Sequence, residues 1–441
     1  MRLNALELRE IGVLIRKVRK ERGLRLEDLA DDHISPATIS NIERGIVSVK
    51  KEKVRYLMGK LGLSEEQLAE LKNGEQKELE NIELKLVAVE NLIDTGEVES
   101  PSKEFKPLQL DDDHPLASYY YFLKGKLLSK KRSWEKAERA LSHAISLCGD
   151  KDPGNIKSSC YNTLSLCSYN QSNLEQAVER ADKGLECFNP SGDRKHVKYL
   201  LMRNKAIYLE RMGLTIQALR IVEEVWPDIP KIDQIETVLG LYWLRAELLR
   251  KNRVFDEAVM FAKEGIDIAR KNRNHDSLFD LWTVLGSIYM DQKEWENAES
   301  CFKVALALQN KLSVKNNVVT TFTRLGVLYA NQGKHEEAKS LLDEAVETGR
   351  KLEDIPRLIS ALLSAGDYYR IQKMDREALT LYQELVSLAQ KHNLKKWEYQ
   401  GWFRIAQCWE NVNEQEFQKA TRNMFRVQFE LHTQEKGGTH L

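Results

Sequence analysis

Residues 277–312 read SLFDLWTVLGSIYMDQKEWENAESCFKVALALQNKL, and this stretch decides the fold. Apolar side chains recur at helical spacing on both sides of the short polar turn DQKEW, which predicts two amphipathic helices. Gly286 and Ala298 put small side chains where the two helices would touch. Tyr289 and Phe302 lie at helical spacings that let them fill the space between the helices. The stretch therefore predicts a helix pair.

The same helix-pair pattern recurs along most of the chain. Alanines stand at intervals of 40, 41, 40, 40, 40 and 40 residues, at Ala137, Ala177, Ala218, Ala258, Ala298, Ala338 and Ala378. A fixed long period indicates a stack of like supersecondary units. The register weakens after Ala378, where residues 395–431 still show a helix-pair pattern. Because terminal repeats are usually atypical, we interpret this last pair as an end cap or a dimer contact.

The small, aromatic and alanine positions resemble the tetratricopeptide repeat family in at least six of the seven units. The resemblance implies an all-α fold in which residues 114–431 form a right-handed superhelix of tetratricopeptide-like helix pairs. We expect seven repeats and a C-terminal capping helix pair, followed by a tail at residues 432–441.

A stacked helical array curves, and the first helix of each pair lines its inner surface. Counting the small residue of that helix as position eight, position five forms a row of Phe122, Asn162, Arg203, Trp243, Thr283, Thr323 and Leu363. Amides and a guanidinium suit a peptide's backbone and carboxylate, and apolar slots suit its side chains. The row predicts a peptide-binding surface, although each of its residues could equally be an ordinary packing residue.

The first 60 residues lack the 40-residue register and carry a different charge. They hold 14 Lys and Arg against 9 Asp and Glu, whereas residues 61–100 hold 3 against 11. In the basic segment, Gly23 ends a first helix, and Leu26 and Leu29 mark a short second one. Ser35 as N-cap, with a proline after it, starts a third helix that runs to Gly45. Two short helices joined by a tight turn predict a helix-turn-helix.

This head, residues 1–72, resembles the DNA-binding domain of the phage-repressor-like (Xre) family over about 60 residues. The resemblance implies that helix 36–43 lies in the major groove of double-stranded operator DNA. Four side chains are implied to face base edges: Pro36, Ala37, Ser40 and Asn41. Four more are implied to meet phosphates: Arg16, Lys17, Thr38 and Arg44. The plainer interpretation, a solvated basic face, would fit the charges but not the helix-turn-helix pattern.

Three further features of the head bear on how it reads DNA. Arg19 and Glu43 match a family ion pair that ties the first helix to the third, so we interpret both as structural. Arg25 stands where the family usually has a Ser or Thr cap, and Pro36 with Ala37 replaces a polar pair. We therefore expect few direct base contacts and more dependence on phosphates and DNA shape.

Residues 73–113 read as an acidic helical neck and a hinge. Ser64 and Gln67 form a capping box, and Ile82, Leu86 and Val89 mark one apolar stripe. Thr95–Asp113 is rich in turn formers, which predicts the hinge. The acidic neck could dock on the basic head, or it could be a solvated connector.

The sequence carries no phosphate-binding glycine loop, zinc-protease or nucleophile-elbow motif, and its histidines have no ligand spacing. We therefore expect no enzyme activity, no cofactor and no metal. No stretch approaches the roughly 20 apolar residues of a membrane span, and the first ten residues are too charged for a signal peptide. A cytoplasmic protein without a membrane partner is predicted.

A head of this kind before a tetratricopeptide array resembles the peptide-sensing regulators of the PlcR, NprR, PrgX and Rap group, and is most like NprR. The resemblance implies a cytoplasmic, quorum-sensing transcription factor that forms homodimers or higher oligomers. A short signalling peptide would bind its array at Asn162, Arg203, Asn204, Trp243, Thr283 and Thr323. The alternative is an adaptor that binds a partner such as a response regulator through the neck and the first repeats, where residues 119–122 form an aromatic cluster. A third possibility is a repressor without a ligand, whose array only dimerises.

Overall fold

The computed structural model describes residues 5–46, 49–105, 107–149, 151–312 and 317–437. Within these ranges the chain is helical, and its only bridge between extended residues joins Asp31 to Ile34. The described chain divides into two compact units, Met1–Leu116 and Ala117–Leu441. The expected all-α fold, with a helix-turn-helix head and tetratricopeptide-like helix pairs, is confirmed.

The first unit holds five α-helices and one 3₁₀ turn among its described residues: α1 (Ala5–Glu21), η1 (Glu27–Leu29), α2 (Pro36–Glu43), α3 (Lys51–Lys60), α4 (Glu65–Asp94) and α5 (Glu99–Phe105). Its core is apolar and includes Ile15, Ile39 and Leu57, none of which is exposed to solvent. These three side chains come from α1, α2 and α3, so the core holds the three helices of the head together.

Two expectations for the first unit need correction. The short second helix is only the 3₁₀ turn η1, because the chain turns extended at Ala30. The segment Thr95–Asp113 is not all hinge, because α5 occupies part of it. The neck itself begins at the predicted capping box of Ser64 and Gln67 and continues without a break to Asp94. A domain boundary between residues 72 and 73 would therefore fall inside α4.

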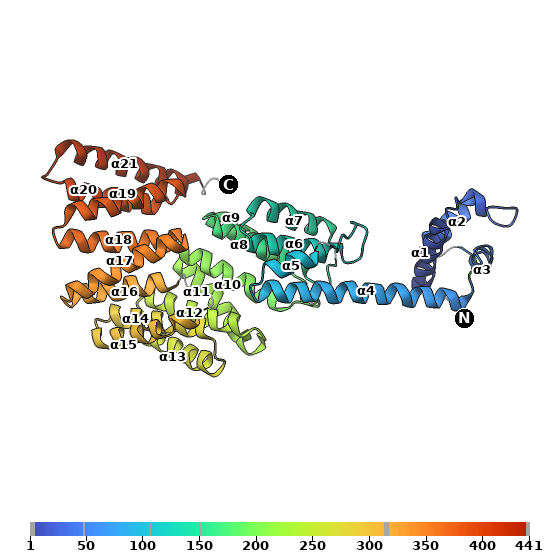
Figure 1. Ribbon diagram of the computed structural model, residues 1–441, viewed down its shortest axis with the longest axis horizontal. Coiled ribbons are helices and arrows are strands. Elements are labelled where there is room, and N and C mark those ends of the chain that lie inside the picture. The colour runs from blue at the N-terminus through green and yellow to red at the C-terminus, as the bar shows by residue number, and fades with distance from the viewer. Residues whose placement is uncertain (1–4, 47–48, 106, 150, 313–316, 438–441) are drawn as a thin grey trace. The chain divides into compact units, whose positions relative to one another are not determined.

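In its described residues, the second unit holds seven helix pairs and a capping pair: α6 (Ala117–Lys130) and α7 (Trp134–Leu147), α8 (Ile156–Asn170) and α9 (Leu174–Glu186), α10 (His196–Arg211) and α11 (Thr215–Val225), α12 (Ile235–Lys251) and α13 (Phe255–Lys271), α14 (His275–Asp291) and α15 (Trp295–Ala307), α16 (Asn317–Asn331) and α17 (His335–Leu352), α18 (Ile355–Ile371) and α19 (Asp375–Lys391), α20 (Lys395–Trp409) and α21 (Glu414–Gly437). Two 3₁₀ turns, η2 (Trp226–Lys231) and η3 (Gln309–Lys311), follow α11 and α15. Figure 1 shows the pairs stacked in chain order.

The seven alanines hold the pairs together, and all of them are fully buried. At Gly286 an added Cβ would come within 2.8 Å of the Phe302 ring, so the first helix of that pair can approach the second only without a side chain there. We call the first helix of each pair the A helix and the second the B helix. Each of the first seven A helices contacts the next one, so the A helices form one continuous layer. The last helix, α21, extends into the predicted tail, of which residues 438–441 lie outside the described part.

Candidate functional site

In the head, α2 packs its apolar side against α1. Ile39 and Ile42 are buried, and Glu43 accepts hydrogen bonds of 2.6 and 2.9 Å from Nε and Nη2 of Arg19. The Glu43 carboxylate raises the pKa of the Arg19 guanidinium. The predicted ion pair between the first and third helices is therefore present. Gly12 lets the helices meet, because an added Cβ there would clash with the Ile42 carbonyl oxygen.

The opposite side of α2 carries the predicted DNA-binding side chains. Ala37 and Arg44 are exposed, and Pro36, Thr38, Ser40 and Asn41 are partly exposed. The Ser35 side chain caps the helix by accepting from the Thr38 backbone N–H at 3.2 Å. Arg44 Nη2 donates to Asn41 Oδ1 over 2.7 Å. On α1, Arg16 and Lys17 are both exposed. The predicted residues thus lie on solvent-facing sides of α1 and α2.

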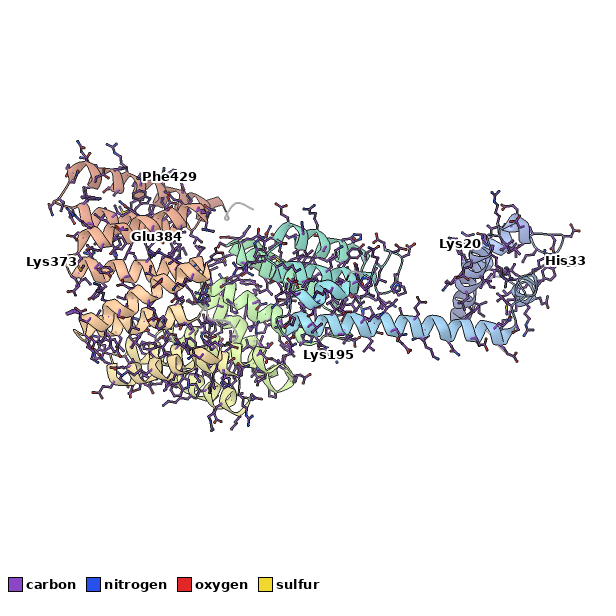
Figure 2. All side chains as sticks on the ribbon, in the orientation of Figure 1. Lys20, His33, Lys195, Lys373, Glu384 and Phe429 are labelled. Carbon is purple, nitrogen blue, oxygen red and sulfur yellow. The ribbon has the colours of Figure 1, made fainter. Side chains whose placement is uncertain are left out.

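A polar cluster that was not predicted from the sequence holds the turn before α2 against α3. Asp31 accepts from Tyr56 Oη at 2.7 Å and pairs with Lys60. These bonds hold the pKa of the Asp31 carboxyl well below its ordinary value. Lys53 donates to the His33 carbonyl oxygen, and the His33 ring stacks on Tyr56 with ring centres 5.5 Å apart. Figure 2 labels His33 in this turn and Lys20 on α1. The cluster fixes where α2 begins.

In the second unit, three of the predicted peptide-binding residues form one chain of hydrogen bonds. Asn204 Nδ2 on α10 donates to Asn162 Oδ1 on α8 over 2.9 Å. The Asn204 amide oxygen in turn accepts from Arg203 Nη2 at 3.1 Å. Arg203 also reaches the Glu236 carbonyl oxygen on α12 at 3.5 Å. These contacts cross three successive A helices, so the cluster lies on the A-helix layer.

Arg203 is a cation held by neutral groups. Its only hydrogen-bond partners in the described part of the chain are the Asn204 amide and the Glu236 carbonyl. Burial lowers the pKa of its guanidinium. Gly240 makes room for it, since an added Cβ there would lie 3.0 Å from Arg203 Cδ. The Glu236 carboxylate also acts on the guanidinium, but within the described residues it makes no direct hydrogen bond to it, so a ligand carboxylate would add a direct ionic contact.

The other three predicted residues are packed more deeply or differently. Trp243 is partly buried against the apolar core between the third and fourth repeats. Thr283 and Thr323 are 6% and 7% exposed, and each donates its hydroxyl to a carbonyl of its own helix, at Phe279 and Val319. Their hydroxyl protons are thus already used in the structure.

Sequence reasoning missed an ionic network toward the C-terminal ends of the A helices. Glu247 on α12 is 5% exposed and accepts bonds of 2.8 and 2.9 Å from Arg250. Arg324 on α16 approaches it to 3.6 Å, and Arg250 also reaches Asp291 at 2.5 Å. Burial opposes ionisation, but the two arginines lower the pKa of Glu247 to about 2. Beside the network, Lys251 pairs with the buried Glu210. One sequence feature could have indicated the network: the charged residue Glu247 occupies position nine of its A helix, directly after the small residue at position eight.

A second missed cluster joins the N-terminal ends of α14, α16 and α18. Asn317 Nδ2 donates to Asp280 Oδ1 over 2.6 Å, and Arg357 donates to the Asn317 amide oxygen. Arg357 itself pairs with Asp354 at 2.6 Å. Burial raises the pKa of Asp280 to about 7, with Arg357 lowering it and Asp276 raising it. Asp280 is thus a carboxyl whose direct partner is a neutral amide.

Comparisons with known proteins agree with this division of the chain. The helix-turn-helix domain family matches residues 10–71, and the tetratricopeptide repeat family matches residues 277–347 and 317–391. No curated protein sequence matches the chain. Within the described residues, no helix is both long and apolar enough to cross a membrane.

Solved structures share the fold at low sequence identity. A Rap protein complexed with competence and sporulation factor has 14% identity and a TM-score of 0.59, covering 80% of this chain and 99% of its own. NprR in complex with its cognate peptide NprX has 17% identity and a TM-score of 0.55, with 80% and 98% covered. The apo form of the quorum sensor NprR from B. thuringiensis has 14% identity and a TM-score of 0.55, with 84% and 99% covered. The chain therefore joins a helix-turn-helix domain to a tetratricopeptide-repeat domain that has the fold of the Rap and NprR structures.

Proposed function

We propose that this chain is a transcriptional regulator that binds operator DNA through α2 and is controlled by a short signalling peptide, as in quorum sensing. The carrying observation is that one chain holds both a helix-turn-helix with exposed polar side chains and an A-helix layer with an amide-bound arginine. Such a regulator acts in the cytoplasm, where its DNA lies. NprR, which shares the fold, has been solved in complex with its cognate peptide.

The peptide would bind on the A-helix layer around Asn162, Asn204 and Arg203. Side-chain amides both donate and accept, so they suit the N–H and C=O groups of an extended peptide backbone. Trp243 on the next A helix would offer an apolar surface for a peptide side chain. Thr283 and Thr323 would line the same surface. Their hydroxyls would not donate to the peptide, because each already donates to a carbonyl of its own helix.

DNA binding would require two copies of the chain. Helix-turn-helix proteins of this kind read two half-sites about one helical turn apart, so we propose a homodimer. We assign this contact to the solvent-facing side of α21, where two large apolar side chains are exposed. Phe425 and Phe429 there are 71% and 63% exposed, and Figure 2 labels Phe429 on this last helix.

The alternative adaptor function would use the neck and the first repeats, including the aromatic cluster at the start of α6. Tyr119, Tyr120 and Phe122 are all buried in the structure, and Arg194 lies over the rings of Tyr119 and Phe122. These three rings are used in packing the first repeat, and Tyr121 alone of the cluster is partly exposed, so the cluster offers little surface to a response regulator. We therefore base the proposal on the peptide and the DNA.

The proposal is tested with the full chain in two binding experiments. Selection from random DNA duplexes should yield a sequence bound at least about 1,000-fold more tightly than the starting pool. Calorimetry should then detect binding of a peptide encoded by a small secreted reading frame beside the gene. Equal affinity for all duplexes would contradict the DNA function, and no heat from any such peptide would contradict the sensor function.

A further inference from the structure

Two sets of charged side chains on the A-helix layer differ in their direct partners. In the ionic network, Glu247, Arg250 and Asp291 already contact opposite charges. Arg203 and Asp280 are held directly only by neutral groups in the described part of the chain. Among the described residues, the Glu236 carboxylate and the Arg357 guanidinium act on these two charges without touching them. A charge that is withdrawn from water without an opposite charge in direct contact is costly, and a ligand that supplies such a contact offsets that cost. Ligand charges should therefore go to the second set.

Both of these charges stand on the N-terminal halves of A helices. Among the described residues, Arg203 on α10 bonds to groups of α10 and α12, and Asp280 on α14 bonds to Asn317 on α16. None of these bonds reaches a B helix. The two groups thus belong to the surface formed by the A helices, on either side of α12.

We propose that the layer binds a zwitterionic, extended peptide, with its free terminal carboxylate at Arg203 and a cationic group at Asp280. The inference rests on the proposed function and adds the polarity and end chemistry of the ligand. The guanidinium of Arg203 donates paired hydrogen bonds that match a carboxylate. The cationic group is an ammonium or guanidinium, from the peptide's amino terminus or from a Lys or Arg side chain.

The arrangement also sets the length of the peptide between its two charges. Arg203 and Asp280 stand two A helices apart, and packed helices lie about 8–10 Å from axis to axis. The span is therefore roughly 16–20 Å, which an extended chain crosses in about five or six residues at about 3.3 Å per residue.

The protonation state of the Asp280 carboxyl should change when a peptide binds. Asp276 on the same helix and Arg357 on α18 are the charged groups that act on the Asp280 carboxyl. When a cation binds, the carboxyl should ionise and release its proton to the buffer. Near pH 7, binding of a peptide that carries the cation should therefore release protons.

The test uses the full chain and three synthetic pools of random peptides about seven residues long. One pool has free termini, one has an amidated carboxyl terminus and one has an acetylated amino terminus. Bound peptides are identified by mass spectrometry for the wild type, Arg203→Gln and Asp280→Asn. Arg220→Gln and Asp256→Asn, at exposed B-helix positions, are the matched controls. Arg203→Lys keeps the positive charge at the site, so it separates the loss of that charge from a loss of thermal stability in Arg203→Gln.

The wild type and both controls should retain the free pool at least about tenfold better than the amidated pool, because a charge-assisted bond is lost on amidation. Arg203→Gln should not distinguish these two pools, and Arg203→Lys should still prefer the free one. If the amino terminus of the peptide supplies the cation, the wild type should retain the acetylated pool less well than the free pool, and Asp280→Asn should not. If a side chain supplies it, the peptides bound to the wild type should be enriched in Lys and Arg, and those bound to Asp280→Asn should not.

Equal retention of free and amidated peptides by the wild type would overturn the role of Arg203. Peptides of the same composition and end chemistry on the wild type and Asp280→Asn would overturn the role of Asp280. Either result would leave the proposed function standing, since peptides would still bind. Retention of no peptide from any pool would overturn the proposed function itself, and this inference with it.

Discussion

Arg44 Nη2 donates a 2.7 Å hydrogen bond to Asn41 Oδ1 on the exposed side of α2. An asparagine that reads adenine uses its amide oxygen and its NH₂ group together. On our account, DNA binding therefore releases the Asn41 oxygen from Arg44, and the freed guanidinium turns to a phosphate. One hydrogen bond thus links the proposed base-reading side chain to a proposed phosphate contact.

Replacing Asn41 with Ala should reduce affinity for the selected operator by about 1–3 kcal/mol and leave affinity for random DNA nearly unchanged. Lys17→Ala should weaken both affinities about equally and lower the salt slope by about 1, because it would remove only a phosphate contact. Fluorescence anisotropy over a range of salt concentrations measures both quantities. Equal losses for the two variants would refute the base contact of Asn41.

Gly12→Ala should destabilise the head by about 1–3 kcal/mol, because the new methyl group would clash with the Ile42 carbonyl oxygen and force α1 from α2. Gly59 is the matched control, since it lies within α3 and an added Cβ there meets nothing within 4 Å. Gly59→Ala should stabilise by up to about 1 kcal/mol through helix propensity. Thermal unfolding of the full chain compares the two variants. A Gly12→Ala head as stable as Gly59→Ala would show that the helices do not pack this closely.

Glu247→Gln should lower the free energy of unfolding by about 3–5 kcal/mol. The substitution keeps the shape of the side chain but leaves Arg250 and Arg324 together without the carboxylate between them. Urea denaturation measures the loss. Glu384→Gln, whose pair with Arg350 on the B helices is more exposed, is the control and should cost under about 1 kcal/mol. Similar small losses for both variants would mean that the network is not a buried one.

Stability should depend on pH through Asp280. Its pKa in the fold is about 7, above the 3.8 of an unperturbed carboxyl. Between these values the folded state keeps a proton that the unfolded state has lost, so the stability contributed by this proton falls as pH rises from about 4 to 7. Asp280→Asn cannot titrate there. Its stability relative to the wild type should rise across that window, by up to about 4 kcal/mol, and then level off.

The pH prediction is checked by urea denaturation of both proteins at several pH values. The difference between them removes the titration of all other groups that the substitution leaves unchanged. A difference that stays flat from pH 4 to 8 would show that the Asp280 carboxyl is not raised by burial.

The repeat architecture could be predicted from the sequence because it depends on small residues at fixed positions. Small residues such as Ala298 and Gly286 stand where the two helices of a pair touch. Their spacing therefore indicates the pair without any knowledge of the superhelix. The proximity of Asn162 to Asn204 follows from the same register, since the two stand at neighbouring positions of adjacent A helices.

The ionic network could not be predicted in this way. Glu247 on α12 meets Arg324 on α16 across the intervening α14, which depends on how tightly the layer curves. Lys396 donates to the Met212 carbonyl oxygen over 3.0 Å across 184 residues, and only the accumulated curvature of the array brings these two together. The repeat register also does not show how deeply a side chain is buried or which partner it bonds. Thr283 lies in the predicted row, yet its hydroxyl is bonded to its own helix.

We propose that a peptide on the A-helix layer controls the DNA-binding head. The most direct test measures the affinity of the full chain for its selected operator with and without a saturating bound peptide. The account predicts a change of about 5- to 150-fold, the range of typical allosteric coupling, and a much smaller change in Arg203→Gln at the same peptide concentration. An operator affinity that stays the same when the peptide is shown to be bound would contradict the claim.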